Sequence, residues 1–466
     1  MANMRKDKNI MPEQDPNVRN KNFDEVALGY GLEAVIDEAQ RCIQCKNAPC
    51  VTGCPVGVKI PEFIKCVANN QIDKSAEILG GCNSLAAVCG RVCPQETQCE
   101  AKCVRAKKGE PVAIGRIERF VGDYIVNNNI VDATSISKEK KKEKVAICGA
   151  GPSGLTCGAE LAKMGYDVTI FEVLHKPGGV LVYGIPEFRL PKSLITKQVK
   201  MVEDLGVKIE TNVIIGKSIE VSELIEEEGF SAVYIASGAG LPNFQNIAGE
   251  NGIGVYSANE FLARINLMKA YDYPNNVTPI NVGQTVVVIG GGNVAMDAAR
   301  SAIRMGAENV KIVYRRSEVE MPARVEEIHH AKEEGIEFVT LTNPTQILLD
   351  DNSVVKGIEC LKMMLTEPDD SGRRRPVAIK GSEYVIDCQT VVVAIGNKPN
   401  PLIPATTKEI GTHSWGGIIT EDDSTKTTMK GVFAGGDAVK GAATVILAMG
   451  DGKSGAREID EYIKSL

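Results

Sequence analysis

The sequence has few aromatic residues, no long apolar run and no excess of positive charge. One Trp and ten Phe among 466 residues give no evident aromatic platform, and a net charge of −7 argues against affinity for nucleic acid or anionic lipid. No apolar run approaches the ~18 residues that a membrane span needs. The polar segment from Met1 to Asn20 lacks a hydrophobic signal core. We therefore expect a cytoplasmic protein with no nucleic-acid and no membrane partner.

Histidine is also scarce, and no catalytic constellation is evident. The four histidines, His175, His329, His330 and His413, form no general-base or metal-ligand pattern. We therefore expect the chemistry to belong to bound cofactors, which the protein has only to hold and orient.

Cysteine, in contrast, is concentrated in one segment. Ten of the fourteen cysteines lie between Cys42 and Cys103. Eight of them form two ladders, C-x2-C-x4-C-x3-C-P from Cys42 to Pro55 and C-x3-C-P-x4-C-x3-C from Cys89 to Cys103, and Cys66 and Cys82 lie between the ladders. Cytoplasmic thiols stay reduced, which argues against a disulfide framework. Zinc would take four ligands from two paired knuckles, whereas these ladders are denser and asymmetric. The spacing favours iron–sulfur clusters, and the last cysteine of such a run usually ligates the other cluster.

The rest of the chain indicates two similar nucleotide-binding units. Residues 1–30 look like an irregular arm, residues 31–130 a small helical domain with helices at 32–40, 61–68 and 116–126, and residues 131–144 a charged linker. Strands at 144–148 and 168–172 enclose one glycine loop and helix, and strands at 285–289 and 310–314 enclose another. Both are β-α-β units with glycines at the strand-to-helix turn, so two doubly wound domains are expected.

The end of the second strand in each unit distinguishes the two ligands. Glu172 lies 23 residues after Gly149, the first glycine of the first loop, where a carboxylate binds the ribose hydroxyls of an adenine nucleotide. The second unit has Tyr314 at the matching position, followed by Arg315 and Arg316, which suit a 2′-phosphate. The first loop therefore suits FAD and the second NADP(H), although a solvated strand end is the alternative for the two arginines.

Over nearly its whole length the chain resembles the family of the small (beta) subunit of NADPH-dependent glutamate synthase. It equally resembles the large subunit of NADH-dependent reduced ferredoxin:NADP oxidoreductase and the N-terminal half of dihydropyrimidine dehydrogenase. The resemblance rests on the two cysteine ladders, the two glycine loops, the segment from Gly178 to Pro191 and Ala434 to Asp437. It implies an α/β fold in which a helical iron–sulfur domain (1–135) precedes two Rossmann-like domains. The NADP(H)-binding domain (283–396) is inserted in the FAD-binding domain (141–282 and 397–466).

The resemblance also implies two [4Fe–4S] clusters whose ligands cross between the ladders. One would use Cys42, Cys45, Cys50 and Cys103. The other would use Cys54, Cys93, Cys99 and a downstream carboxylate or amide, which falls on Glu118. Cys89 is the rival for that fourth position, and an oxygen ligand would alter the potential of the cluster.

The same resemblance assigns the residues of the two nucleotide sites. For FAD these are Gly149, Gly151, Ser153, Gly154, Glu172, Gly179, Leu181, Arg189, Asp437, Thr444 and Val445. For NADP(H) they are Gly292, Asn293, Val294, Ala295, Arg315 and Arg316. The helix that follows Thr444 would direct its positive end to the flavin N1–C2 carbonyl and stabilise the reduced ring.

We predict a flavoprotein oxidoreductase that passes electrons between NADP(H), FAD and two clusters to a second redox subunit. That partner would be the glutamate synthase large subunit. The alternative partner is a small flavin and [2Fe–2S] subunit, working with ferredoxin in an electron-bifurcating enzyme. A hypothesis of another class is a redox sensor or binding module with structural clusters. A thioredoxin-reductase-like enzyme is disfavoured, because residues 283–396 hold only Cys360 and Cys388 and no C-x-x-C.

Overall fold

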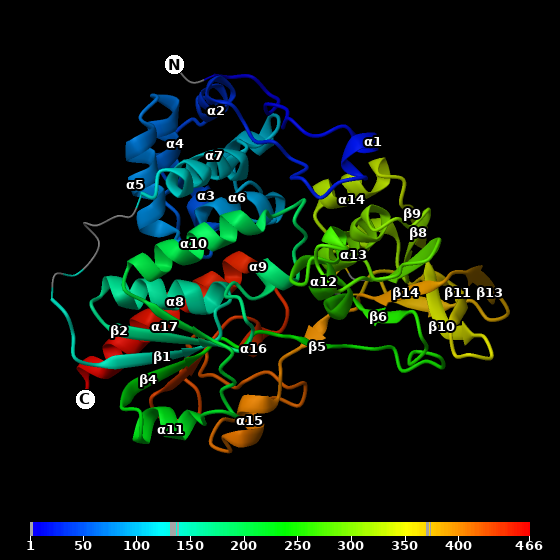
Figure 1. Ribbon diagram of the computed structural model, residues 1–466. Coiled ribbons are helices and arrows are strands. Elements are labelled where there is room, and N and C mark those ends of the chain that lie inside the picture. The colour runs from blue at the N-terminus through cyan, green and yellow to red at the C-terminus, as the bar shows by residue number, and fades with distance from the viewer. Residues whose placement is uncertain (1–2, 131–136, 138, 370–371, 373) are drawn as a thin grey trace.

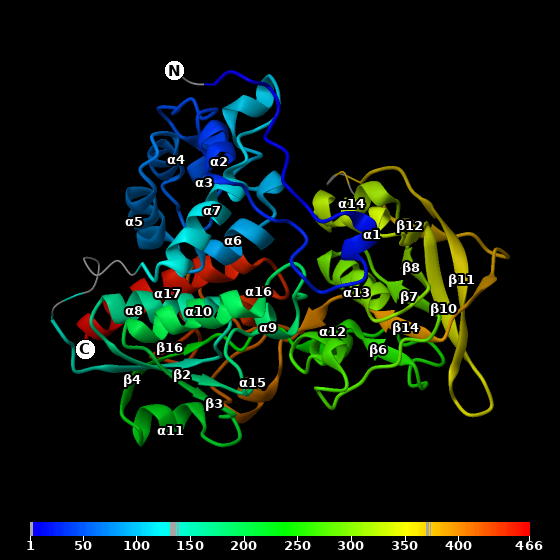
Figure 2. The same ribbon diagram turned by 45° about the horizontal axis from the view of Figure 1, so that its top comes forward.

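The computed structural model describes residues 3–130, 137, 139–369, 372 and 374–466 as an α/β protein with a helical N-terminal domain (Figure 1 and Figure 2). Half of the predicted linker, residues 131–136 and 138, lies outside the described residues. The predicted fold class is confirmed: a helical domain precedes two parallel sheets, and the strands of the second lie within the sequence of the first. Among the described residues, no helix is both long and apolar enough to cross a membrane.

The N-terminal domain consists of short amphipathic helices. Its longest helix buries Ile114, Ile117, Val121 and Ile125, which recur every three or four residues and so form one apolar face. The elements are α1 (Pro16–Arg19), α2 (Leu32–Ala39), α3 (Pro49–Thr52), α4 (Ile60–Ala68), α5 (Ile72–Cys82), α6 (Ala86–Val92), η1 (Gln95–Thr97), η2 (Val104–Lys107) and α7 (Ile114–Asn127).

Glycines bring α6 and α7 into backbone contact. A Cβ on Gly90 would lie 2.4 Å from the Arg119 nitrogen, and one on Gly122 would lie 2.5 Å from the Ala87 nitrogen. Neither distance is compatible with a larger side chain, so both helices depend on glycine at the crossing. This close contact fixes the second cysteine ladder against the helix that carries Glu118.

The first parallel sheet has the strand order β16-β4-β1-β2-β3. Its strands β1 and β4 are almost wholly buried, as expected of a sheet covered by helices on both faces. Its elements are β1 (Lys144–Cys148), α8 (Pro152–Lys163), β2 (Asp167–Glu172), α9 (Val180–Tyr183), α10 (Lys192–Asp204), β3 (Lys208–Thr211), α11 (Val221–Glu226), β4 (Phe230–Ile235), α15 (Leu402–Thr406), β16 (Val432–Ala434), α16 (Asp437–Lys440) and α17 (Val445–Lys464).

The second parallel sheet has the order β6-β14-β7-β8-β9. The predicted boundary at residue 283 lies after β6 and α12, although β6 pairs with β14 in this sheet. A strand of three residues gives too little periodicity to be recognised in the sequence. The elements are β6 (Val255–Ser257), α12 (Ala258–Asn266), η4 (Ala270–Asp272), β7 (Thr285–Ile289), α13 (Asn293–Arg304), β8 (Asn309–Tyr314), η5 (Glu318–Glu320), α14 (Val325–Glu333), β9 (Glu337–Thr340) and β14 (Thr390–Val393).

Two smaller sheets complete the fold. An antiparallel sheet beside the second parallel sheet contains β10 (Thr342–Leu349), β11 (Val355–Leu365), β12 (Pro376–Ala378) and β13 (Tyr384–Asp387). The chain passes between the two nucleotide-binding units through the antiparallel pair β5 (Leu241–Pro242) and β15 (Asn397–Lys398).

The helical domain and the first sheet share one apolar core. Buried residues of α4, α6 and α7 form a continuous cluster with those of α8, α10 and α17. Figure 2 shows the helical domain above α8, α10 and α17. The opposite face of the first sheet and the two faces of the second sheet have separate clusters. The iron–sulfur segment is therefore anchored to the first nucleotide-binding unit by apolar burial.

The segment predicted as an irregular arm connects the helical domain to the second sheet. It contains α1, which lies beside α14 in both views. Arg19 is 1% exposed and its guanidinium contacts Glu333 and Glu334 of the α14 region. Phe23 stacks on Tyr271 with ring centroids 4.4 Å apart. Residues 3–30 of the arm therefore form an ordered connection between the helical domain and the second sheet.

Candidate functional site: two cysteine groups and two nucleotide loops

The structure brings Cys42, Cys45, Cys50 and Cys103 together, and we call these four the distal group. Their side chains line one small cavity with apolar residues of α4. All four are partly exposed. Burial, with the adjacent Cys42 and Cys103, raises the pKa of the Cys50 thiol to about 11. Four thiols that converge on one cavity fit a bound cation. A cation lowers the pKa of its sulfur ligands and so offsets the effect of burial on Cys50.

The loop between Cys45 and Cys50 has a strained backbone. Ala48 has φ of 37° and Gln44, on the other side of Cys45, has φ of 50°, both in the left-handed region. Such residues cost of order 1–3 kcal/mol each and cluster at ligand sites. The Gln44 side-chain amide also donates to the Cys42 sulfur at 3.3 Å. The loop is therefore held in a conformation that directs sulfurs inward.

A second group, which we call the proximal group, consists of Cys54, Cys93, Cys99 and Glu118, with Cys89 beside them. Burial and the adjacent Glu118 and Cys89 raise the pKa of Cys54 to about 11. Burial, Glu118 and Cys54 are also among the causes that raise the pKa of Cys99. The pKa of Cys93 is raised first by its hydrogen bond with Cys89 and then by burial. The predicted crossing of the ladders therefore corresponds to two groups in space.

Glu118 is a buried carboxylate with no cation beside it among the described residues. It is 7% exposed, and Asn83 Nδ2 donates to its Oε1 at 2.8 Å. Burial raises the pKa of Glu118 to about 7. A buried charge is normally paired or coordinates a metal. The donor set of three sulfurs and one carboxylate oxygen thus fits an iron–sulfur cluster.

Cys89 lies on the inner side of the proximal group, toward α17. It is fully buried, and its sulfur lies 3.8 Å from Asn83 Oδ1 and 3.5 Å from Met449 Sδ. It is close enough to compete with Glu118 as the fourth ligand, so the choice between them stays a prediction. Cys66 is buried and Cys82 half-buried, outside both groups.

The helix α17 joins the proximal group to the first nucleotide-binding unit. Besides the sulfur contact of Met449, a Cβ on Gly450 would lie 3.2 Å from the Pro55 carbonyl oxygen. Lys453 Nζ donates to the carbonyl of Cys82 at 2.8 Å. The N-terminus of this helix is capped by Thr444, whose side chain accepts from Leu447 N at 3.4 Å.

The first glycine loop forms an open cradle for a phosphate-bearing ligand. Gly149 has φ of 113°, and a Cβ on it would lie 2.5 Å from the Ala236 oxygen. A Cβ on Gly154 would lie 2.0 Å from the Gly149 oxygen, so both positions require glycine. A Cβ on Gly151 would meet no atom within 4 Å among the described residues. The space in front of Gly151 fits the pyrophosphate of a dinucleotide.

Several predicted FAD residues surround this loop. Glu172 accepts from Ala150 N at 2.7 Å and Leu174 N at 2.9 Å, while Ser153 Oγ hydrogen-bonds Tyr234 OH at 2.8 Å. A Cβ on Gly179 would lie 2.9 Å from Gly151 Cα.

The predicted residues near the end of the chain lie around a short turn. Asp437 begins α16, and it accepts from Ala443 N at 3.3 Å. Burial raises the pKa of Asp437 to about 6. Val445 begins α17. A carboxyl group in this position suits hydrogen bonding to ligand hydroxyls.

Two predicted FAD residues have close contacts within the protein, and their part in FAD binding stays a prediction. Leu181 is fully buried in the apolar core. The Arg189 guanidinium contacts both carboxylate oxygens of Asp297 at 2.7 Å and Glu327 Oε1 at 3.0 Å. Arg189 therefore fastens the loop after α9 to α13 and α14 of the second unit. Any contact of Arg189 with FAD would use atoms that do not bind Asp297 or Glu327.

The second glycine loop has the same design. Gly290 has φ of 144°, and a Cβ on Gly291 would lie 2.7 Å from the Tyr314 ring. Gly292 and Asn293 begin α13, where Val294 is 45% exposed and Ala295 is fully buried. Asn293 Oδ1 accepts from Arg324 N at 2.9 Å.

Arg315 and Arg316 follow β8 beside this loop, as predicted. Arg315 is exposed and Arg316 half-buried. The Nε of Arg316 is buried and has no hydrogen-bond partner. A guanidinium nitrogen in that state fits an anion that completes the site, such as the 2′-phosphate of NADP(H).

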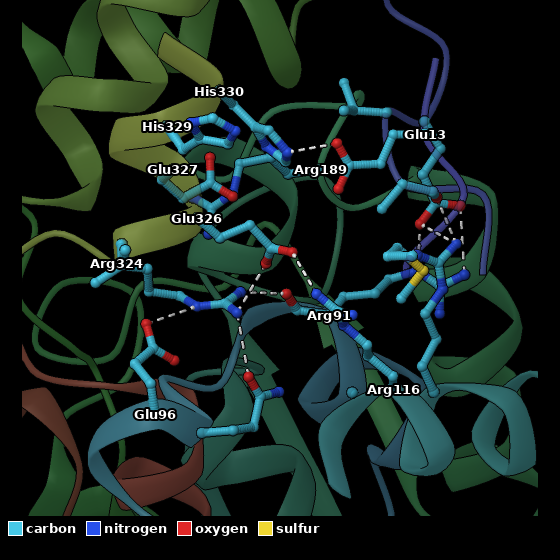
Figure 3. A pocket seen from close by; sticks show the side chains of 18 of the residues that line it. Glu13, Arg91, Glu96, Arg116, Arg189, Arg324, Glu326, Glu327, His329 and His330 are labelled. Atoms are coloured by element: carbon cyan, nitrogen blue, oxygen red, sulfur yellow. Dashed lines mark hydrogen bonds and ion pairs between the residues drawn. The ribbon is translucent and has the colours of Figure 1, made fainter. Parts of the chain in front are cut away.

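A larger charged cavity of about 380 Å³ lies where the arm, α6, α7 and α14 meet (Figure 3). Arg324 extends across it, donating to the Arg91 carbonyl at 2.9 Å and to Gln95 Oε1 at 3.2 Å. On its far side His330 hydrogen-bonds Glu13 at 3.0 Å. Ligand atoms of Glu13, Glu326 and His330 lie within 4.8 Å of one another. Glu13 forms an ion pair with Arg19, and Glu326 forms ion pairs with Arg116 and Arg324. Because arginines already neutralise both carboxylates, we assign no cation there.

Sequence analysis overlooked the residues that connect these sites. Asn83, Arg324 and Met449 belong to no ladder or glycine loop, and their partners lie 35 to 360 residues away. No local signal marks them. The sequence also shows no sign of the hydrogen bond between His330 and Glu13, because these residues are 317 positions apart.

The geometry agrees with comparisons to known families. A model described as dihydropyrimidine dehydrogenase domain II, 4Fe-4S cluster, matches residues 19–130. A model of pyridine nucleotide-disulphide oxidoreductases matches residues 191–452, and one of NAD(P)-binding Rossmann-like domains matches residues 147–184. The 4Fe-4S, flavin and NAD(P) cofactor types that we predicted are thus supported, whereas the number of clusters is not tested.

Curated relatives identify the family. The chain is 33% identical over 461 residues to the glutamate synthase [NADPH] small chain of Azospirillum brasilense, covering 98% of this chain and 95% of that one. Identity to the Escherichia coli (strain K12) small chain is 32% over 458 residues, with 97% and 96% covered. The chain belongs to the glutamate synthase small-chain family. It is an oxidoreductase of that family, as predicted.

Related modules also occur in longer proteins. Identity to the NADP(+)-dependent formate dehydrogenase subunit beta of Moorella thermoacetica is 38% over 444 residues, covering 90% of this chain and 60% of that one. Among solved structures, the Mycobacterium tuberculosis FprA complex with NADPH is 21% identical with a TM-score of 0.57, covering 70% of this chain and 85% of that one. That likeness shows the fold of the two nucleotide-binding units alone.

Proposed function

We propose that this chain is the NADPH-oxidising subunit of a glutamate synthase, delivering electrons from NADPH to a partner subunit. The single observation that carries the proposal is the position of α17. Its N-terminus, at Thr444, lies beside the predicted FAD residue Asp437, and its flank, at Met449, contacts Cys89 next to the proximal group. One rigid element thus spans the two sites between which electrons must pass.

When bound, NADPH and FAD supply hydride transfer, and two [4Fe–4S] clusters supply single-electron transfer. The first glycine loop, Glu172 and Asp437 would hold FAD, with the positive end of α17 facing the flavin. The second glycine loop would hold the pyrophosphate of NADPH, and Arg315 and Arg316 its 2′-phosphate. The residues assigned to each site are those named from the sequence, including Gly179, Leu181 and Arg189, whose part in FAD binding stays a prediction.

The two cysteine groups would hold the two clusters. Cys93, Cys99 and Glu118 are buried and Cys54 is partly exposed, whereas Cys42, Cys45, Cys50 and Cys103 are all partly exposed and line one small cavity. This difference in burial supports an order in which electrons enter through the proximal group and leave through the distal one. Glu118 would give the proximal cluster an oxygen ligand and hence a potential different from that of the distal cluster.

A partner subunit completes the proposal. Relatives that this chain matches over nearly their whole length are glutamate synthase small chains, which favours the glutamate synthase large subunit as partner. We also propose a cytoplasmic location for the complex, because thiols stay reduced in that compartment. We propose that residues 1–135 form the iron–sulfur domain, 141–282 with 397–466 the FAD-binding domain and 283–396 the NADP(H)-binding domain. Because β6 pairs with β14, we assign β6 and α12 to the NADP(H)-binding domain as well.

Anaerobic purification of the tagged chain tests the function. We expect FAD, about eight iron atoms per chain if two [4Fe–4S] clusters are bound, faster oxidation of NADPH than of NADH, and a large glutamine-using flavoprotein as partner. Preference for NADH, or a small flavin and [2Fe–2S] partner, would overturn the assignment. If the purified chain transfers no electrons from NADPH to a dye, only the hypothesis of a redox sensor or binding module with structural clusters remains.

A further inference from the structure

Tyr234 is a fully buried phenol in the first nucleotide-binding unit. It lies in β4, and its ring packs against α17. A Cβ on Gly435 would lie 2.1 Å from the Tyr234 hydroxyl oxygen, and one on Gly455 would lie 2.4 Å from Tyr234 Cε2. Neither distance is compatible with a larger residue, so these two glycines form a slot for the phenol.

The phenol forms a hydrogen bond with a predicted FAD residue. Its oxygen lies 2.8 Å from Ser153 Oγ, and this bond joins β4 to the first turn of α8. In the part of the chain that the structure describes, neither hydroxyl has a second hydrogen-bond partner. Each hydroxyl carries one hydrogen. The bond therefore uses one of the two hydrogens, and the other has no acceptor among those residues.

Ser153 lies between two parts of the predicted FAD site. It follows the first glycine loop as the second residue of α8, and a Cβ on Gly436 would lie 3.0 Å from Ser153 Cβ. Gly436 directly precedes Asp437, at the start of α16. In the same loop, the space in front of Gly151 is open among the described residues. A pyrophosphate held there would offer the Ser153 hydroxyl an acceptor.

The surroundings of the two hydroxyls decide which one donates. Tyr234 is enclosed by β4, α17 and the glycine slot, where its hydrogen would have no acceptor other than Ser153 Oγ among the described residues. A buried donor without a partner is strongly disfavoured. Burial also raises the pKa of Tyr234 well above its usual value, so the phenol keeps its hydrogen. Tyr234 therefore donates, and the hydrogen of Ser153 is free for a ligand.

The main chain around Ser153 is fixed by other contacts. A Cβ on Gly452 would lie 2.3 Å from the Ser153 carbonyl oxygen, so α17 packs directly on this turn of α8. Gly436 N donates to Asp451 Oδ2 at 3.0 Å, which holds the turn before Asp437. Removal of the phenol hydroxyl should therefore leave the backbone in place and allow the Ser153 hydroxyl to rotate among its staggered positions.

We propose that Tyr234 is a positioning residue for FAD: its hydroxyl donates to Ser153 Oγ and so directs the Ser153 hydrogen to the pyrophosphate of the nucleotide. The inference rests on the proposed function, because it requires FAD at the first glycine loop. It goes further by giving a role to a residue outside the glycine loops and a direction to one hydrogen bond. Tyr234 acts only through Ser153, so its effect should depend on the serine hydroxyl.

A double-mutant cycle on FAD affinity tests the proposal. The dissociation constant is measured from the rise in free flavin fluorescence when the anaerobically purified full chain is diluted. We expect Tyr234→Phe and Ser153→Ala each to raise it about 3- to 10-fold, as for the loss of one hydrogen bond. The double variant should lie within about twofold of Ser153→Ala alone, because the two hydroxyls act as a unit.

Tyr166→Phe is the matched control. It removes a buried phenol hydroxyl that donates to Asp460 at 2.9 Å, beyond the opposite end of α8, and should leave FAD affinity within about twofold of the parent chain. Phosphorus NMR of the bound FAD gives a second readout. Tyr234→Phe and Ser153→Ala should shift a pyrophosphate resonance in the same direction, whereas Tyr166→Phe should not.

An unchanged FAD affinity in Tyr234→Phe would overturn the inference. The same holds if Tyr234→Phe weakens FAD binding equally with and without the Ser153 hydroxyl, because the phenol would then act by packing alone. If the parent chain purifies without FAD, the proposed function itself is wrong. If FAD is bound and reduced by NADPH but the two substitutions are additive, only this inference is wrong.

Discussion

The sulfur of Cys89 lies 3.5 Å from the sulfur of Met449, although 360 residues separate them in sequence. Cys89 belongs to the second cysteine ladder and Met449 to the second turn of α17. The contact fixes the distance between the proximal group and the N-terminus of α17. Because both side chains are fully buried, their packing also contributes to stability.

Met449→Ala should weaken this connection. Truncation of a buried methionine costs about 2–5 kcal/mol, since it removes apolar contacts and leaves a cavity. We expect a lower melting temperature and slower reduction of the clusters by NADPH, with FAD retained, as measured by calorimetry and stopped-flow absorbance. Met449→Leu conserves the volume and should cost less than about 1.5 kcal/mol. Equal destabilisation by the two variants would show that volume at this position is unimportant.

Arg315 and Arg316 should determine the preference for NADPH. Each charge-assisted hydrogen bond contributes about 1.5–3 kcal/mol, so Arg316→Ala should raise KM for NADPH roughly 10- to 100-fold. KM for NADH should change little, because NADH has no 2′-phosphate. Arg264→Ala, at an exposed guanidinium on α12, is the control and should leave both constants unchanged. A parallel loss for both nucleotides would instead indicate damage to the fold.

Glu334 should make stability depend on acid pH. Burial opposes its ionisation, but hydrogen bonds and charge from Arg304 and Arg300 outweigh it and hold its pKa well below 4.5. Because the folded pKa lies below the unfolded one, this stabilisation is present above pH ~4.5 and is lost as the pH falls further. Glu334→Gln should therefore lower the melting temperature strongly at pH 7, since breaking a buried ion pair costs about 3–5 kcal/mol.

The difference in melting temperature between the Glu334→Gln variant and the parent chain should become smaller below pH ~4. Glu228→Gln, at an exposed position, is the control and should follow the parent at every pH. A constant difference from pH 3 to pH 7 would contradict the proposed cause.

Glu118 and Cys89 should respond differently to substitution. If Glu118 ligates iron, Glu118→Ala should lower the iron content and change the electron paramagnetic resonance signal of one cluster. Cys89→Ala should retain both clusters, because that sulfur would not bind iron. Cys66→Ala, at a buried cysteine outside both groups, is the packing control. Loss of iron from the Cys89 variant alone would reverse the assignment.

Much of the fold was predictable because its signals are local. Strands at 144–148 and 285–289 form with the predicted bounds, since each is a short apolar run that ends at a glycine loop. The antiparallel sheet from β10 to β13 was not anticipated. Pro344 interrupts the first of its strands, and pairing with β11 is decided by contacts between distant residues.

The site was predictable where chemistry imposes spacing. Cysteines and glycines occur at fixed offsets because a cluster or a phosphate requires them, and the structure gathers them accordingly. Arg189 illustrates the limit. The family resemblance assigns Arg189 to the FAD site, which stays a prediction, and gives no sign of its ion pairs with Asp297 and Glu327, which only the folded chain brings near. Glu118 was found through a family resemblance, since a carboxylate in a helix has no pattern of its own.

The most direct test of the two-cluster account is anomalous diffraction at the iron absorption edge from crystals of the anaerobically purified chain. The account predicts two separate groups of four iron atoms. One group should lie among Cys42, Cys45, Cys50 and Cys103, and the other should place an iron within bonding distance of the Glu118 carboxylate. A single group of iron atoms, or an iron bound to Cys89 with Glu118 free, would contradict it.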